Sequence, residues 1–260
     1  MRLRVLTWNV SFGYGLGSEG IGYFQRPQTH FRDALLGMSE LIKEMKADIV
    51  FLQEVDFHSR RSHYEDQLGE LARMSGLLYH QAIESWNAPY VPYPGLNPKN
   101  HFGRIRSGGG VLSRFPIHTV LNELLPKPKE NGKLFNFFYL NRYLQVVQTM
   151  GLRFCNLHLE AFSEDNRELH LVKLQDRLID YQIDIAGGDF NGDPALNEGT
   201  KDGWSLFPAP EPTFPCPEPN RTLDGFILKN GRFKNISLRT LNSGFVSDHF
   251  PVFLEVDVDE

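Results

Sequence analysis

The chain carries an acid and an imidazole side by side near its C-terminus, in the segment Ser247-Asp248-His249-Phe250-Pro251. Neighbouring side chains of a β-strand point to opposite faces, so Asp248 and His249 cannot face one site from within a strand. Pro251 has no N–H to give to a sheet, so the last strand is predicted to begin there and to run through Val256. Asp248 and His249 are therefore predicted to lie on a loop at the mouth of a strand, where they would suit metal-assisted phosphate chemistry.

Four earlier segments share a second pattern, in which an apolar, strand-like run ends in polar side chains. These segments are Thr7-Trp8-Asn9, Leu52-Gln53-Glu54, Asn156-Leu157-His158 and Gly187-Gly188-Asp189-Phe190-Asn191. Asp189 and Asn191 are two residues apart, so they lie on the same side if the local backbone is extended.

The residues between Asn9 and Glu54 favour a β-α-β unit. Apolar side chains recur at helical spacing from Phe31 to Met45, which predicts an amphipathic helix followed by a strand from Ile49. If the two strands are parallel, Asn9 and Glu54 both lie at carboxyl ends, the edge where α/β sheets usually hold ligands.

Other local patterns predict further elements. We expect a helix over Gln67–Met74 that stops at Gly76, a hairpin over Val146–Glu160 that turns at Met150-Gly151, and a helix around Leu171–Ile179. His170, which matches none of the polar patterns above, is expected at the surface.

Together with Leu223-Asp224-Gly225-Phe226-Ile227, the five polar segments resemble in their order the signature of the endonuclease/exonuclease/phosphatase superfamily, whose fold is that of DNase I. The resemblance covers nearly the whole chain. It implies an α/β fold, a four-layered α/β sandwich in which two β-sheets pack face to face with helices outside. Because the motifs extend from Asn9 to His249, we expect a single domain over residues 1–260.

The same resemblance implies a divalent-metal-dependent hydrolase of phosphoester bonds, in the first place a phosphodiesterase. Glu54 is the expected principal metal ligand, with Asn9 and Asp248 as oxygen neighbours. An all-oxygen site favours Mg²⁺ or Mn²⁺ over zinc. By itself, Glu54 could equally be a solvated carboxylate at the end of a strand.

The resemblance also implies the catalytic roles. Asp189 and Asn191 would hold and activate the attacking water, and His158 and His249 would contact the scissile phosphate. Asp224 would pair with His249 and favour its charged form. The alternative for Asp224 is an ordinary hairpin turn, because Asp-Gly is a strong turn signal.

Residues 84–107 are rich in Pro, Tyr, Asn and Gly and are predicted to form one long loop. Arg104 and Arg106 stand there among aromatic residues, so they are candidate substrate-binding residues for a phosphate joined to a ring or lipid group. A structural surface loop is the alternative.

Two substrate classes remain open on the sequence. The first expectation is a nuclease-type substrate, DNA or RNA, and the alternative is a phospholipid or sugar-phosphate head group. A binding module without catalysis is the remaining alternative, disfavoured because every expected polar position is filled. The net charge of −5 argues only slightly against tight duplex binding.

The apolar run from Leu134 to Leu140 is predicted to be a buried core strand, with a membrane-docking hairpin as the alternative. No apolar run approaches the roughly 20 residues that cross a bilayer, so peripheral contact is the only membrane contact left open. The two cysteines, Cys155 and Cys216, lack CxxC spacing. This cysteine usage fits a reducing cytoplasm best. Separately, we expect the chain to be a monomer.

Overall fold

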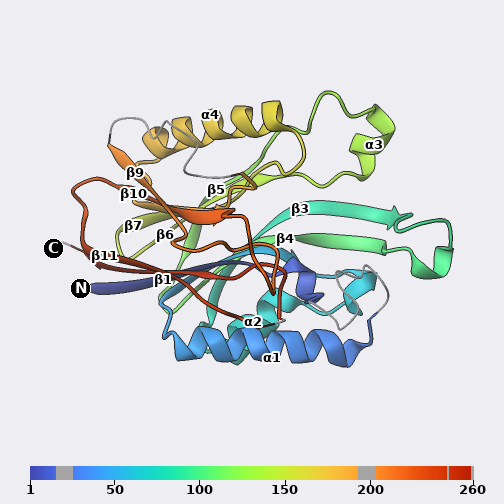
Figure 1. The fold of residues 1–260 in the computed structure, drawn as a ribbon, viewed down its shortest axis with the longest axis horizontal. Helices are drawn as coiled ribbons and strands as arrows, with labels where there is room; N and C mark the ends of the chain where they lie inside the picture. The colour runs from blue at the N-terminus through green and yellow to red at the C-terminus, as the bar shows by residue number, and fades with distance from the viewer. Residues whose placement is uncertain (16–25, 193–202, 245, 259–260) are drawn as a thin grey trace.

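The computed structural model describes residues 1–15, 26–192, 203–244 and 246–258. These residues form two six-stranded sheets, one in the order β11-β12-β1-β2-β4-β3 and the other in the order β5-β6-β7-β8-β10-β9 (Figure 1). The first sheet contains β1 (Arg2–Asn9), β2 (Ile49–Asp56), β3 (Tyr79–Val91), β4 (Gly103–Ser113), β11 (Phe233–Thr240) and β12 (Val252–Val258). The second contains β5 (His118–Leu124), β6 (Tyr143–Thr149), β7 (Leu152–His158), β8 (Ile185–Asp189), β9 (Trp204–Pro208) and β10 (Asp224–Lys229). The α-helices are α1 (Gln28–Glu44), α2 (Gln67–Ser75), α3 (Lys133–Phe138) and α4 (Glu164–Asp180).

The two sheets face each other, with α1 and α2 outside the first and α4 outside the second (Figure 1). Apolar side chains of both sheets meet between them: the ring of Phe51 on β2 lies 6.3 Å from that of Phe154 on β7 and 6.4 Å from that of Phe226 on β10. Separate apolar clusters lie under α1 and α2 and under α4. The predicted four-layered α/β sandwich is confirmed.

The helices, hairpin and final strand predicted from local sequence patterns are present in the structure. One face of α1 buries Phe31, Met38 and Ile42, as the helical spacing requires. The carboxylate of Asp66 accepts a hydrogen bond from the first turn of α2, and Gly76 ends that helix in the left-handed conformation, with φ of 79°. The β6–β7 hairpin turns at residues 150 and 151, and β12 leaves residues 248 and 249 in the preceding loop.

The prediction of one long loop over residues 84–107 is wrong. β3 and β4 pair antiparallel along most of this stretch and project as a ribbon, so only residues 92–102 connect them (Figure 1). The glycines after Arg106 lie inside β4 because neighbours leave no room for a side chain: a Cβ at Gly108 would lie 1.9 Å from the carbonyl oxygen of Ile83. Glycine there permits close packing rather than a turn.

Two further expectations fail. The run predicted as a core strand forms the short helix α3, on which Leu134, Phe135 and Phe137 are exposed. His170 is fully buried rather than at the surface, because its ring nitrogen Nε2 bonds the carbonyl oxygen of Pro126 at 2.8 Å and so anchors α4 to the segment before α3.

Candidate active site

The polar strand ends converge at one edge of the sandwich. β1 and β2 are parallel neighbours that end near Asn9 and Glu54, and β7 and β8 are parallel neighbours that pair His158 with Asp189 at their last residues. A cavity of about 560 Å³ opens there. Its polar lining includes Asn9, Glu54, Arg142, Asp189, Asn191, Asp248 and His249.

Asp189 is buried at the centre of this arrangement. Its Oδ2 atom accepts a hydrogen bond from Asn9 Nδ2 at 3.0 Å and lies 3.5 Å from His158 Nε2 and 3.9 Å from His249 Nε2. Its Oδ1 atom accepts a hydrogen bond from the backbone N–H of Asn191 at 2.8 Å. Burial raises the pKa of Asp189 to about 6, although the positive His249 ring opposes the shift. This carboxylate can therefore take up a proton close to neutral pH.

His249 is paired with a second buried acid. Its Nδ1 atom lies 3.0 Å from Asp224 Oδ2, which also accepts a hydrogen bond from the hydroxyl of Thr213 at 2.6 Å. Burial disfavours charge on the ring, but the carboxylates of Asp224 and Asp189 outweigh it and raise the pKa of His249 to about 10. His249 is thus a cation at neutral pH, and Asp224 begins strand β10 rather than forming a turn.

His158 is held neutral. Burial and the adjacent guanidinium of Arg142, which contacts its Nε2 atom, lower the pKa of His158 well below its ordinary value. Arg142 is itself buried and was missed by the sequence reasoning. The β6–β7 hairpin pairs Tyr143 with His158, so counting back from the predicted turn would have placed Arg142 beside this site.

Glu54 reaches the cavity from a bulge in β2. The pairing with β4 shifts between Leu52 and Val55, and Glu54 there has a φ of 56°, a conformation that non-glycine residues rarely adopt. Burial and the negative charge of Asp248 raise the pKa of Glu54 to about 7. Acidic groups that face one another in this way favour a cation between them.

The chemistry of these groups fits a divalent cation. The carboxylate of Glu54 accepts no hydrogen bond from the described residues, and Asn9 and Asp248 line the same cavity with further oxygen atoms. Asp189, Asp224 and His249 also offer ligand atoms within 4.8 Å of one another, so this buried group could hold a metal as well. However, Asp224 already pairs with His249, and a protonated imidazole has no lone pair for a metal. Glu54, Asn9 and Asp248 stay the predicted ligands.

Four cavity residues share a strained backbone. Ser11, Phe12, Glu54 and Asn191 have φ values of 46°, 55°, 56° and 54°. Such conformations cost about 1–3 kcal/mol each and tend to occur where function requires a particular geometry.

Aromatic side chains form the walls above this polar floor. One wall contains Phe12, Trp86, Tyr93 and Phe102, and a second wall contains Phe135, Phe138 and Phe162. The two walls meet where the indole N–H of Trp86 donates to the carbonyl oxygen of Phe138 at 2.9 Å. Behind the first wall, Arg61 makes two 2.9 Å bonds to the buried Asp56 and stacks 3.6 Å from the centre of the Phe12 ring. The sequence analysis singled out the aromatic residues around Arg104 and Arg106, of which Trp86, Tyr93 and Phe102 line the cavity, but it did not predict the second wall.

Arg104 and Arg106 are not brought to the cavity. Both lie on β4, where Arg104 bonds the side-chain oxygen of Asn87 at 2.6 Å and Arg106 forms an ion pair with Glu84. Neither is among the residues that line the cavity.

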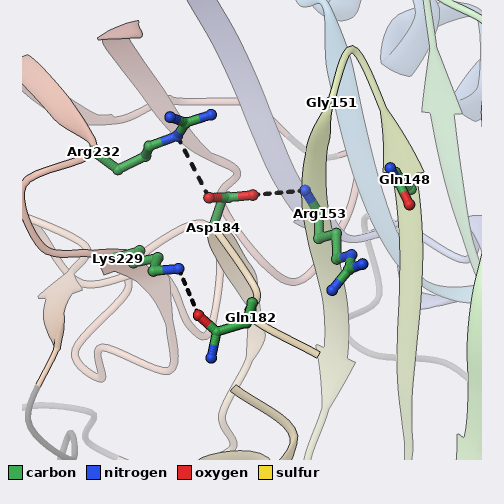
Figure 2. Close-up of a pocket in the computed structure, with 7 residues that line it drawn as sticks. All are labelled: Gln148, Gly151, Arg153, Gln182, Asp184, Lys229 and Arg232. Carbon is green, nitrogen blue, oxygen red and sulfur yellow. Dashed lines mark hydrogen bonds and ion pairs between the residues drawn. The ribbon is translucent and has the colours of Figure 1, made fainter. Parts of the chain in front are cut away.

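A smaller hollow of about 300 Å³ lies elsewhere on the second sheet (Figure 2). It is lined by Gln148, Gly151, Arg153, Gln182, Asp184, Lys229 and Arg232. Asp184 accepts the backbone N–H of Arg153 at 2.9 Å and lies 3.6 Å from Arg232 Nε, and Lys229 bonds Gln182 at 2.8 Å (Figure 2). These polar groups bond to one another, and none of the predicted site residues lies here.

A sandwich whose strand ends bring carboxylates and imidazoles into one cavity defines the DNase I-like class of folds. The model of the endonuclease/exonuclease/phosphatase family matches residues 6–249, and the chain belongs to this family. A search of curated proteins finds no match.

Solved structures with the same fold share little sequence with this chain. An endonuclease/exonuclease/phosphatase from Beutenbergia cavernae matches with a TM-score of 0.68 and 19% identity over 99% of this chain and 72% of its own. A mannosyl-6-phosphatase from Bacteroides thetaiotaomicron matches with a TM-score of 0.63 and 17% identity over 98% of this chain and 99% of its own. A humanized D. rerio TDP2 matches with a TM-score of 0.61 and 16% identity over 99% of each chain.

Proposed function

We propose that this chain is a divalent-metal-dependent phosphodiesterase in which Asp189 activates a water for in-line attack on phosphorus. The observation that carries the proposal is the pKa order of two neighbouring groups, both raised above their ordinary values. Asp189 has a pKa of about 6 and His249 one of about 10, and their side chains approach within 3.9 Å. Between these values the carboxylate is a base and the imidazole a cation, which is the pairing that phosphoester hydrolysis needs.

Each group of the site has a separate role in the proposed reaction. Asn9 and the backbone of Asn191 orient Asp189 so that it takes the proton of the water as the new P–O bond forms. The P–O bond opposite the attacking water breaks at the same time, and the leaving alkoxide takes up a proton from solvent. The charged ring of His249 and the guanidinium of Arg142 donate hydrogen bonds to phosphate oxygens as negative charge builds up on them. Glu54, Asn9 and Asp248 would hold a Mg²⁺ or Mn²⁺ ion, which neutralises phosphate charge when bound.

The cavity walls favour a diester over a monoester and a partly apolar substrate over an extended polyanion. Aromatic side chains line the same cavity as the polar floor, so carbon-bearing groups on the ester oxygens would have apolar neighbours. Four described cations line the cavity, Arg61, Arg142, Arg221 and His249, and Arg61 is already paired with the buried Asp56. These features support a phospholipid-type head-group diester more than the nucleic acid that the sequence first suggested.

The names of the structural neighbours support phosphoester chemistry in general. They include a mannosyl-6-phosphatase and a D. rerio TDP2 complexed with a single-strand DNA product. At 17% and 13% identity they show a shared fold, so the substrate proposal depends on the cavity of this chain.

The test is hydrolysis of bis-nitrophenyl phosphate with Mg²⁺ or Mn²⁺, with and without a chelator, beside single-strand DNA, RNA and phosphatidylcholine in detergent. We expect metal-dependent hydrolysis of the soluble diester and of the lipid. A preference for DNA or RNA that falls steeply with salt would instead establish a nuclease. No metal-dependent hydrolysis of any of these would refute the proposed activity.

A further inference from the structure

The helix α3 has its polar and apolar sides reversed. Among the described side chains of α3, the polar one, Asn136, points inward and donates to the carbonyl oxygen of Pro128 at 2.9 Å, while the backbone carbonyl oxygen of Asn136 accepts from Lys127 Nζ at 2.7 Å. Its apolar side chains point outward: Leu134, Phe135 and Phe137 are 76%, 58% and 66% exposed. A surface helix in water normally shows the opposite arrangement.

Further exposed aromatic side chains stand around the same opening. Phe162, between β7 and α4, is 84% exposed, and Tyr93, at the end of the β3–β4 ribbon, is 49% exposed. Phe135, Phe162 and Tyr93 all line the mouth of the candidate active site. We refer to Tyr93, Leu134, Phe135, Phe137 and Phe162 as the apolar rim.

Hydrogen bonds hold the rim in place. The indole N–H of Trp86 on β3 donates to the carbonyl oxygen of Phe138 at 2.9 Å. The hydroxyl of Tyr139 donates to the buried carboxylate of Glu160 at 2.5 Å, and the same oxygen accepts the backbone N–H of Phe162 at 3.1 Å. The ribbon, α3 and the Phe162 segment are therefore tied to one another, so the exposure of the rim is built into the fold.

The position of the rim restricts what can cover it. Because three residues of the rim line the cavity, a permanently bound protein or a second copy of the chain on the rim would obstruct the entry of substrate. A lipid surface avoids this problem, because the same surface that covers the rim also supplies the substrate to the cavity. Aromatic side chains with polar groups behind them are suited to the boundary between lipid head groups and acyl chains. No helix in the described part of the chain is long and apolar enough to cross a membrane.

We propose that the apolar rim inserts into the surface of a phosphatidylcholine-type bilayer and presents head-group phosphodiesters to the cavity. The identity of the substrate rests on the proposed function, whereas binding to the bilayer does not. With a net charge of −5, the chain is not expected to depend on anionic lipids or on low salt for this binding. Apolar insertion would provide the affinity instead.

The experiment measures co-flotation with phosphatidylcholine vesicles for the wild type, Leu134→Ser/Phe137→Ser and Leu36→Ser/Leu78→Ser. The first pair is on the rim but does not line the cavity, and the control pair is exposed elsewhere, on α1 and just before β3. We expect the rim variant to lose vesicle partitioning by about tenfold or more. The control variant should bind as the wild type does, and binding should persist at high salt.

Two activity measurements, on a soluble diester and on vesicles, distinguish failure of the docking proposal from failure of the proposed function. Both variants should hydrolyse soluble bis-nitrophenyl phosphate at the wild-type rate, and only the rim variant should lose activity on vesicles. Absent vesicle binding, equal binding by both variants, or rim-dependent self-association in light scattering would overturn the inference. Vesicle binding without hydrolysis of any diester would refute the proposed function and leave the docking surface standing.

Discussion

His249 Nδ1 lies 3.0 Å from Asp224 Oδ2, although the two residues come from a loop and from the first position of strand β10. The distance identifies Asp224 as the group that keeps the His249 ring charged, because burial alone would lower the pKa of that ring. The hydroxyl of Thr213 holds the same carboxylate oxygen at 2.6 Å. These contacts make the protonation state of His249 testable through Asp224.

Asp224→Asn should shift the alkaline limit of activity. In the wild type, kcat/KM should rise as Asp189 loses its proton near pH 6 and fall as His249 loses its proton near pH 10. Without the Asp224 charge, the alkaline limb should move towards neutral pH, because burial then opposes the charged ring with fewer carboxylates beside it, and activity above pH 8 should fall. Thr213→Val, which retains the charge, should move the limb less. An unchanged limb in Asp224→Asn would remove His249 from the proposed role.

Glu54→Gln should weaken Mg²⁺ or Mn²⁺ binding measured by calorimetry and largely abolish hydrolysis. In the wild type, the metal must displace a proton from Glu54 below its pKa of about 7, so the apparent Kd should rise about tenfold per pH unit below that value. This pH dependence should disappear in the variant. Glu70→Gln, at a half-buried position on α2 where Glu70 pairs with Arg73 away from the cavity, is the matched control. Equal metal affinity in Glu54→Gln and wild type would place the ion elsewhere.

Asp189→Asn should lower kcat by about 10²–10⁴-fold because an amide cannot accept the proton of the attacking water. KM and metal affinity should change little if Asp189 acts in the chemical step. Asp180→Asn, on the exposed side of α4, should retain full activity. Near-normal turnover in Asp189→Asn would show that another group activates the water.

Arg142→Lys should reduce kcat/KM about tenfold or more, because a lysine keeps the charge but cannot reproduce the guanidinium's contact geometry beside His158. A thermal melt would establish that the variant is folded. Arg104→Ala/Arg106→Ala, on β4 outside the cavity, should leave KM for every substrate unchanged. A raised KM in the double variant, with Arg142→Lys unaffected, would return the phosphate-binding role to the β3–β4 ribbon.

Much of the polar floor of the site could be predicted because its placement follows from local rules. Asn9, Glu54, His158 and Asp189 all come at or near the ends of apolar strands, and such ends of parallel neighbours meet at one sheet edge whatever the rest of the chain does. The Asp248-His249 loop followed in the same way from side-chain alternation and from Pro251.

Contacts between distant segments decided which residues form the walls of the cavity and which residues lie outside it. Composition alone suggested that residues 84–107 were a loop, but pairing between strands made them a ribbon, which took Arg104 and Arg106 away from the cavity. The run from Leu134 was apolar enough for a core strand, and yet the hydrogen bonds of Asn136 turned its aromatic side chains outward. The order of residues was enough to predict α1, α2, α4 and the polar groups at the strand ends, because these depend on neighbours within a few positions. Only tertiary packing decided which aromatic side chains surround those groups and which charges remain free, because burial and pairing depend on residues far away in the chain.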